Sequence, residues 1–257
     1  MASKPVVGAQ LYTLRKFCRT ESEIVETFKK VADIGYSTVQ LSGLGPVEPD
    51  AVAAALKDAG LTAAATHVSW ERLREDLDAV IAEHKLWGCV HPAIGGLPGE
   101  YLCAEGVGRF LEELAPVAER LQQEGMDFSY HNHAKELARF DGKTWLGMLY
   151  EQADPGLLKA EIDTYWIVAG GGDPVSWIRC CAGREPLLHL KDMVVLPDQT
   201  QRMAEVGEGN LNWPAILDAA CESGVEYLLV EQDHCYERDP FESLAISYRN
   251  LKAMGFE

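Results

Sequence analysis

Four apolar segments in the second half of the chain carry or end in histidine and carboxylate groups: MDFSYHNH, LLKAEID, PLLHLKDM and VEYLLVEQD. The groups are, in chain order, His131 and His133 with Glu136 close behind, then Glu161 and Asp163, His189 and Asp192, and Glu231 with Asp233 and His234. Buried charges are costly unless they are paired or bound to a metal. Several carboxylates that converge on one place also repel each other unless a cation lies between them. The four segments together therefore predict a site for one divalent cation.

Each residue taken alone also fits a structural role. A single histidine in a core strand is more often a hydrogen-bonded core group, and Asp163 has the position of a helix N-cap. Glu231 is the hardest to explain in this way, because glutamate is rarely buried without a partner. The glycines of Gly170-Gly171-Gly172 fit a turn better than a phosphate-binding loop. The metal prediction therefore depends on the convergence of the four segments.

The elements that carry these residues alternate along the whole chain. Short apolar runs are followed by longer amphipathic ones, such as ESEIVETFKKVADIG, in which Ile24, Phe28, Val31 and Ile34 are spaced as one helical face. Eight such strand–helix units without a linker predict an α/β fold, a single (β/α)₈ TIM barrel over residues 1–257. An open doubly wound sheet is the alternative, but the first turn, AQLYTLR, lacks the glycine fingerprint of a dinucleotide site. In a barrel, the polar strand ends meet at the C-terminal mouth.

Composition excludes several classes of function. The chain has 40 acidic and 23 basic residues, for a net charge of −17, which argues against nucleic acid and anionic membrane surfaces as partners. No apolar run has the length of a signal peptide or a membrane span. The seven cysteines form no C-x-x-C pair, so they are expected to be reduced thiols and do not match a zinc pattern. We therefore expect a cytoplasmic protein.

The chain resembles the sugar phosphate isomerase/epimerase superfamily, the xylose isomerase-like barrels. The resemblance extends from GAQLYT near the N-terminus to DPFESL near the C-terminus, and its most specific pieces are YHNHAKEL, EIDTYWIVAGGGDP, LLHLKDM, EVGEGNLNW and LVEQD. The subgroup with H-N-H-x-x-E on the fifth strand is the most similar.

The resemblance implies one divalent ion held by four residues from the fifth to eighth strands. Asp163, His189 and Glu231 match the motif. The fourth ligand is open between His131 and Glu136, and we expect Glu136 to bind the metal with His131 beside it as an acid/base group. Three oxygens and one imidazole favour Mn²⁺, with Mg²⁺, Co²⁺ or Zn²⁺ as alternatives.

The resemblance also implies a metal-dependent isomerase or epimerase that acts on a sugar or keto sugar through a metal-stabilised enediolate. Glu231 and either Glu136 or His131 would transfer the proton, and Lys191 is counted with these catalytic groups. A dehydratase or lyase on inosose-like or 3-keto-glycoside substrates is the alternative. Two other classes, an abasic-site endonuclease and a metal-free sugar sensor, fit less well because of the acidic charge and the retained carboxylates.

Further residues at predicted strand ends are expected to bind the substrate: Gln10, His67, His133, Trp166 and Asp192. Trp166 would offer an apolar wall to the sugar, although rim aromatics are more often plain packing. Lys191 and Asp192 could instead form an ion pair at the rim. We expect a small unphosphorylated sugar or polyol as the partner, and the resemblance suggests a homo-oligomer.

Overall fold

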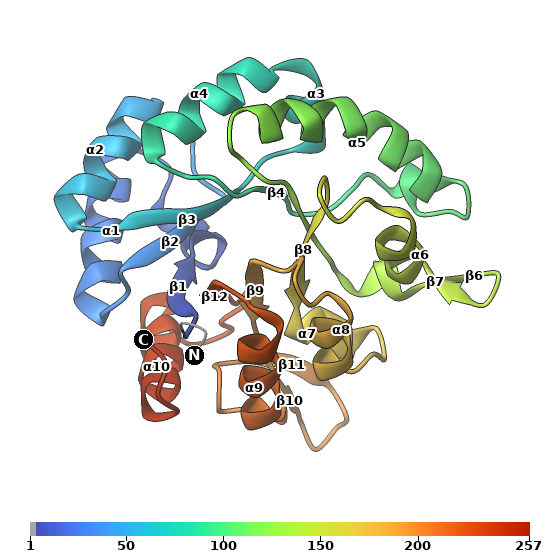
Figure 1. The fold of residues 1–257 in the computed structure, drawn as a ribbon. Helices are drawn as coiled ribbons and strands as arrows, with labels where there is room; N and C mark the ends of the chain where they lie inside the picture. Colours follow the sequence, from blue (N-terminus) through green and yellow to red (C-terminus); the bar gives the residue numbers. More distant parts are fainter. Residues whose placement is uncertain (1–3) are drawn as a thin grey trace.

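Eight parallel strands close into a barrel that helices surround in the computed structural model, which describes residues 4–257 (Figure 1). Around the barrel the strands follow the order β1-β12-β9-β8-β5-β4-β3-β2. This closed parallel sheet confirms the prediction of a (β/α)₈ barrel. The strands are β1 (Val6–Gln10), β2 (Thr38–Leu41), β3 (Thr62–His67), β4 (Pro92–Ile94), β5 (Ser129–His131), β8 (Lys159–Asp163), β9 (Leu187–Leu190) and β12 (Tyr227–Val230).

The helices connect successive strands and lie outside the barrel (Figure 1). They are α1 (Glu21–Ile34), α2 (Pro49–Ala59), α3 (Trp70–Glu75), α4 (Leu77–Trp87), α5 (Gly106–Gln123), α6 (Trp145–Gln152), α7 (Thr164–Ala169), α8 (Pro174–Cys180), α9 (Trp213–Ser223) and α10 (Pro240–Ala253). Three short 3₁₀ segments are η1 (Leu11–Phe17), η2 (Gly99–Tyr101) and η3 (Ala134–Leu137).

Local sequence explains where the helices begin and end. Helix α1 starts with a capping box, in which the Thr20 side chain accepts from the Glu23 backbone N–H and the Glu23 side chain accepts from the Thr20 N–H. The helix stops at Gly35, which has a φ of 124°. Glycine adopts positive φ angles without the steric cost that other residues would have. Its buried residues include Ile24, Phe28 and Val31, so the predicted apolar stripe is the face that packs on the barrel.

The barrel interior changes character along the strands. Leu187, Leu229 and Ala65 belong to a small apolar cluster separate from the main core. Two residues further along β9, His189 is fully buried, as is Gln40 on β2. Because side chains alternate between the two faces of a strand, the same inward-facing rows are apolar at one end and polar at the other. The polar end is the C-terminal mouth.

Two small antiparallel hairpins are added to the barrel. One joins β6 (Arg139–Phe140) to β7 (Lys143–Thr144), and the other joins β10 (Asp192–Val195) to β11 (Gln201–Ala204). The second hairpin follows directly on β9, with Asp192 paired with Ala204 at its base. It therefore extends from the strand that carries His189.

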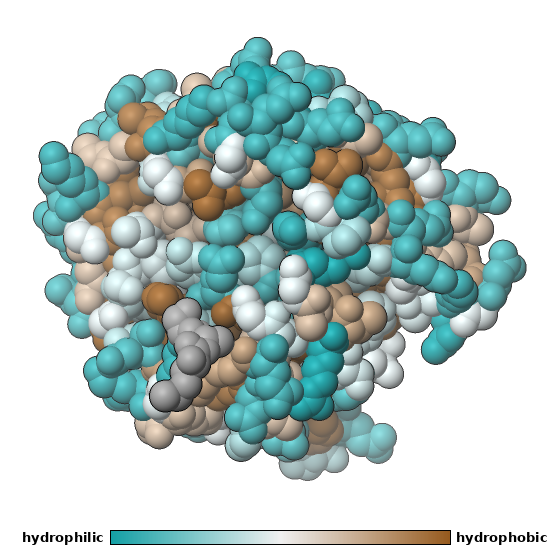
Figure 2. Space-filling model, viewed as in Figure 1, coloured by the Kyte–Doolittle hydropathy of each residue, from teal (hydrophilic) through white to brown (hydrophobic). Residues whose placement is uncertain are grey.

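Hydrophilic side chains cover much of the outer edge of the face seen in Figure 1, and hydrophobic ones show mainly between the helices (Figure 2). This distribution agrees with a net charge of −17. Among the helices of residues 4–257, none has the length and apolar character needed to cross a bilayer.

Candidate active site

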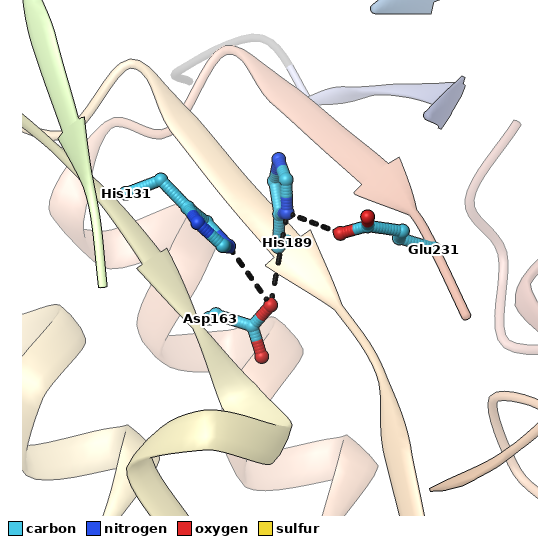
Figure 3. Close-up of side chains that lie close together, drawn as sticks. All are labelled: His131, Asp163, His189 and Glu231. Atoms are coloured by element: carbon cyan, nitrogen blue, oxygen red, sulfur yellow. Dashed lines mark hydrogen bonds and ion pairs between the residues drawn. The ribbon is translucent and has the colours of Figure 1, made fainter. Parts of the chain in front are cut away.

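His131, Asp163, His189 and Glu231 converge at the mouth of the barrel (Figure 3). Each offers one ligand atom, and these four atoms all lie within 4.8 Å of one another. The Nε2 atom of His131 is 3.1 Å from Asp163 Oδ2. The Nδ1 atom of His189 is 2.9 Å from Glu231 Oε2 and 3.7 Å from Asp163 Oδ2. All four residues are buried, so the cluster could hold a metal ion.

The barrel topology explains why these residues meet. Strands β5, β8, β9 and β12 are successive neighbours in the barrel, and Asp163 lies directly opposite His189 in the β8–β9 register. Asp163 combines both roles considered for it. Its Oδ1 atom caps α7 by accepting from the Trp166 backbone N–H at 3.0 Å, which leaves Oδ2 for the cluster.

Glu136 does not join the cluster, so our expectation that it is the fourth ligand needs correction. Its Oε1 atom accepts from the Tyr130 hydroxyl at 2.9 Å, and its Oε2 atom accepts from the His133 backbone N–H at 2.9 Å. The alternation of β5 explains this placement, because His131 faces into the barrel while Tyr130 faces away from it. Glu136 bonds to Tyr130 and therefore lies on the outer side of β5. The imidazole of His131 is the fourth member of the cluster.

The buried ammonium group of Lys191 balances the cluster carboxylates. Its Nζ atom lies 2.8 Å from Glu231, 3.1 Å from Asp163 and 2.7 Å from Asp233. Burial alone would raise the pKa of Asp163, but Lys191 and the two imidazoles outweigh it and hold that pKa well below its usual range. For Glu231, burial likewise acts to raise the pKa, and Lys191 and His189 lower it strongly. Both carboxylates are therefore ionised.

The histidines of the site differ in charge. Burial and the neighbouring His189 lower the pKa of His131 to about 3, and burial and Lys191 lower the pKa of His133 to about 4. His189 behaves in the opposite way, since Glu161 and Asp163 overcome its burial and raise its pKa well above the usual value. The neutral ring of His131 could bind a cation through Nε2 once the ring proton that faces Asp163 moves to Nδ1.

The donor set fits a divalent cation. Two imidazoles and two carboxylates at one point form a four-ligand set of the kind that first-row divalent metals take. Nδ1 of His131 is buried and has no hydrogen-bond partner. The other ring nitrogen, Nε2, faces Asp163 within the cluster.

A cavity of about 340 Å³ opens directly over the cluster. Gln10, His67 and His133 line it together with His131 and Glu231, so these three predicted substrate-binding residues lie where a ligand would be. A larger hollow of about 560 Å³ lies beside the β10–β11 hairpin. It contains none of the four cluster residues, and we therefore regard the smaller cavity as the site.

Two other predicted substrate contacts lie elsewhere. Asp192 is fully buried and accepts from the backbone N–H groups of the loop at Gly207, Gly209 and Leu211 and from the indole N–H of Trp213. The carboxylate of Asp192 therefore anchors this loop, whereas we had expected it to bind the substrate. Trp166 packs against His133, with ring centroids 5.2 Å apart and ring planes tilted by 48°, and it does not line the cavity.

Gln40 and Glu161 were not predicted in their observed roles. Gln40 is fully buried and bonds to Glu161 and His189 beneath the cluster. Glu161 precedes Asp163 by two residues in the apolar run LLKAEID. Strand alternation therefore places both on the inner face, and this spacing was the signal for a second buried carboxylate.

The glycine triplet is a turn, as the sequence favoured. The backbone N–H groups of Gly170, Gly171 and Gly172 donate to the carbonyls of Trp166, Val168 and Ile167 at the end of α7. These donors are therefore used within the chain and do not form a phosphate cradle.

The chain belongs to the xylose isomerase-like TIM barrel family, whose model matches residues 28–252. This membership confirms the family-level resemblance, while the H-N-H-x-x-E subgroup stays a prediction. No protein with curated annotation matches the chain by sequence.

Solved structures share the fold at low sequence identity. A sugar phosphate isomerase/epimerase from Parabacteroides distasonis is 22% identical with a TM-score of 0.82, covering 98% of this chain and 94% of that one. An L-ribulose 3-epimerase is 20% identical with a TM-score of 0.72 and coverage of 98% and 94%. The probable 3-DHS dehydratase AsbF from Bacillus anthracis is 15% identical with a TM-score of 0.68 and coverage of 96% and 98%.

Proposed function

We propose that the protein is a divalent-metal-dependent isomerase or epimerase that acts on an unphosphorylated sugar or keto sugar. The observation that carries this proposal is the cluster of His131, Asp163, His189 and Glu231, whose ligand atoms lie within 4.8 Å of one another under a cavity at the barrel mouth. Family membership and the epimerases among its structural neighbours support the same class of reaction.

These four residues would hold the cation. When bound, it would act as a Lewis acid that polarises a sugar carbonyl and acidifies the neighbouring C–H bond. With His131 in place of Glu136, the donors are two nitrogens and two oxygens. This softer set favours Mn²⁺, Co²⁺ or Zn²⁺ over Mg²⁺.

The cavity walls offer groups that can move a proton. Glu231 presents a carboxylate that Lys191 keeps ionised, so it can accept a proton from the carbon beside the carbonyl. His133 lines the cavity from the N-cap of η3, just after β5, as a neutral imidazole with an unpartnered Nδ1 atom. Return of the proton to the same carbon on its other face gives an epimer, and return to the neighbouring carbon gives an isomer.

The charges of the cavity favour a substrate without phosphate. None of its lining residues is lysine or arginine, whereas Glu231 and Asp233 both line it. The buried ammonium of Lys191 is already engaged by three carboxylates. Phosphate recognition normally uses charge-assisted bonds from arginine or lysine, and this cavity supplies none.

Product analysis in D₂O tests the proposal. The purified, Mn²⁺-loaded protein is incubated with a panel of ketoses, and the products are analysed by NMR. Zn²⁺-loaded protein is used where spectra of the protein itself are recorded. Incorporation of one deuteron without loss of water is the expected result for an epimerase or isomerase. Loss of water would instead identify the dehydratase alternative. Folded Glu231→Gln and Asp163→Asn variants that keep full metal content and turnover would contradict the proposal.

A further inference from the structure

A chain of hydrogen bonds crosses the barrel beneath the candidate metal cluster. His67 Nε2 lies 2.7 Å from Glu161 Oε2, and Glu161 Oε1 accepts from Gln40 Nε2 at 2.7 Å. The Oε1 atom of Gln40 then lies 2.6 Å from His189 Nε2. Gln40, Glu161 and His189 are fully buried, so solvent does not compete for these bonds.

The chemistry of these groups fixes the direction of every bond in the chain. An ionised carboxylate only accepts hydrogen bonds, so the NH₂ group of Gln40 must face Glu161. The amide oxygen of Gln40 then faces His189 and requires a donor, which places a proton on His189 Nε2. His67 Nε2 also faces a carboxylate oxygen and must carry a proton. A ring that carries its only proton on Nε2 is left with an unprotonated Nδ1 atom, and His189 reaches this state when cation binding displaces its Nδ1 proton.

The two Nδ1 atoms point to different parts of the site. Nδ1 of His189 lies 2.9 Å from Glu231 Oε2, within the cluster. Nδ1 of His67 faces the cavity, 3.4 Å from Ser42 Oγ and 3.5 Å from Gln10 Nε2. The space beside His67 Nδ1 exists because residue 95 is glycine. A side chain at residue 95 would place its Cβ atom 3.2 Å from His67 Nδ1.

We propose that Glu161 is a positioning residue that, with Gln40, holds His67 and His189 in the tautomer protonated on Nε2. His189 then presents Nδ1 to the cation, and His67 presents Nδ1 as an acceptor for a substrate hydroxyl. The amide of Gln10 and the hydroxyl of Ser42 complete a polar subsite for that hydroxyl. The part that concerns His189 and the substrate rests on the proposed function, whereas the tautomer of His67 does not.

Imidazole NMR tests this proposal on the wild-type protein. Long-range ¹H–¹⁵N spectra of histidine-labelled protein distinguish protonated from unprotonated ring nitrogens. His84 is an internal reference for the opposite tautomer, because its Nδ1 lies 2.7 Å from the Val80 carbonyl oxygen. His67 is expected to carry its proton on Nε2, and it is assigned by the signal lost in His67→Gln. In the Zn²⁺-loaded protein, His189 is expected to show the same pattern. A proton on His67 Nδ1 in the wild type would overturn the proposal.

Glu161→Gln tests the cause. The NH₂ group of Gln40 still requires an acceptor, so the amide oxygen of the new glutamine must face Gln40. Its NH₂ group then faces His67 Nε2, which must become an acceptor, so the proton of the His67 ring moves to Nδ1. The Mn²⁺ dissociation constant is expected to rise about tenfold, as for other groups that orient a metal-bound histidine. Glu185→Gln is the matched control, because it makes the same substitution at another buried glutamate, one that does not line the cavity. It is expected to change neither the spectrum of His67 nor the Mn²⁺ affinity.

The outcomes separate this inference from the proposed function. If wild-type protein binds neither Mn²⁺ nor Zn²⁺ while His67 keeps its proton on Nε2, the proposed function fails and the role of Glu161 towards His67 stands. If the cation binds but Glu161→Gln changes neither the His67 spectrum nor the affinity, the positioning role is wrong. Should Glu161→Gln fail to fold, the wild-type spectrum decides the tautomer.

Discussion

The ammonium group of Lys191 and the carboxylate of Glu231 form an ion pair of 2.8 Å inside the barrel mouth, where neither side chain is more than 3% exposed. Lys191 also contacts Asp163 and Asp233. One buried positive charge therefore compensates three carboxylates at the place where the cation is proposed to bind.

Replacing Lys191 with methionine is expected to destabilise the metal-free protein by about 3–5 kcal/mol, because it leaves buried carboxylates without a partner. Urea denaturation with and without Mn²⁺ measures the effect, and Mn²⁺ is expected to restore part of the loss. Lys143→Met is the control, since its ion pair with Glu151 is exposed and should contribute little. Equal effects of the two substitutions would show that Lys191 does not compensate the cluster.

The fourth ligand is tested by comparing His131→Ala with Glu136→Gln. The first removes a nitrogen from the cluster, and the Mn²⁺ dissociation constant is expected to rise at least tenfold. The second changes a carboxylate that bonds to Tyr130 and His133, so Mn²⁺ affinity should change little. Isothermal titration with Mn²⁺ measures both, and the reverse order of effects would restore Glu136 as the ligand.

Glu185 predicts a specific dependence of stability on pH. Its carboxyl group is fully buried without a side-chain hydrogen-bond partner, and burial raises its pKa well above the usual value of 4.5. The folded state therefore keeps a proton that the unfolded state releases above pH 4.5, so this group lowers stability as the pH rises.

Glu185→Gln is thus expected to increase the free energy of unfolding at pH 7 and to change it little at pH 4. Chemical denaturation at the two pH values checks this difference. A gain of the same size at both would contradict the raised pKa.

Asp192→Ala should release the loop that the carboxylate anchors. Loss of the acceptor for several backbone N–H groups and the Trp213 indole is expected to cost about 2–4 kcal/mol of stability. Faster hydrogen exchange at residues 207–211 checks this directly. Asp198→Ala is the control, because Asp198 accepts only a local turn bond from Thr200. Unchanged exchange in Asp192→Ala would contradict the anchoring role.

The sequence was sufficient for the barrel and for three of the four cluster residues. Alternating apolar and amphipathic segments encode strands and helices through their two periodicities, and parallel strands bring their C-terminal ends to one mouth. Asp163, His189 and Glu231 lie at such strand ends, so the local pattern placed them at one mouth, and the family resemblance singled them out among the polar residues there.

Only the tertiary structure separates His131, which lies in the cluster, from Glu136, which lies outside it. Both lie near the end of β5, and only the inward direction of His131 and the path of η3 separate them. The same holds for Glu161 and Gln40, which are far apart in sequence and meet because β8 and β2 face each other across the barrel. Sequence periodicity tells which residues share a face of a strand, whereas the partner across the barrel depends on how the closed sheet brings distant strands together.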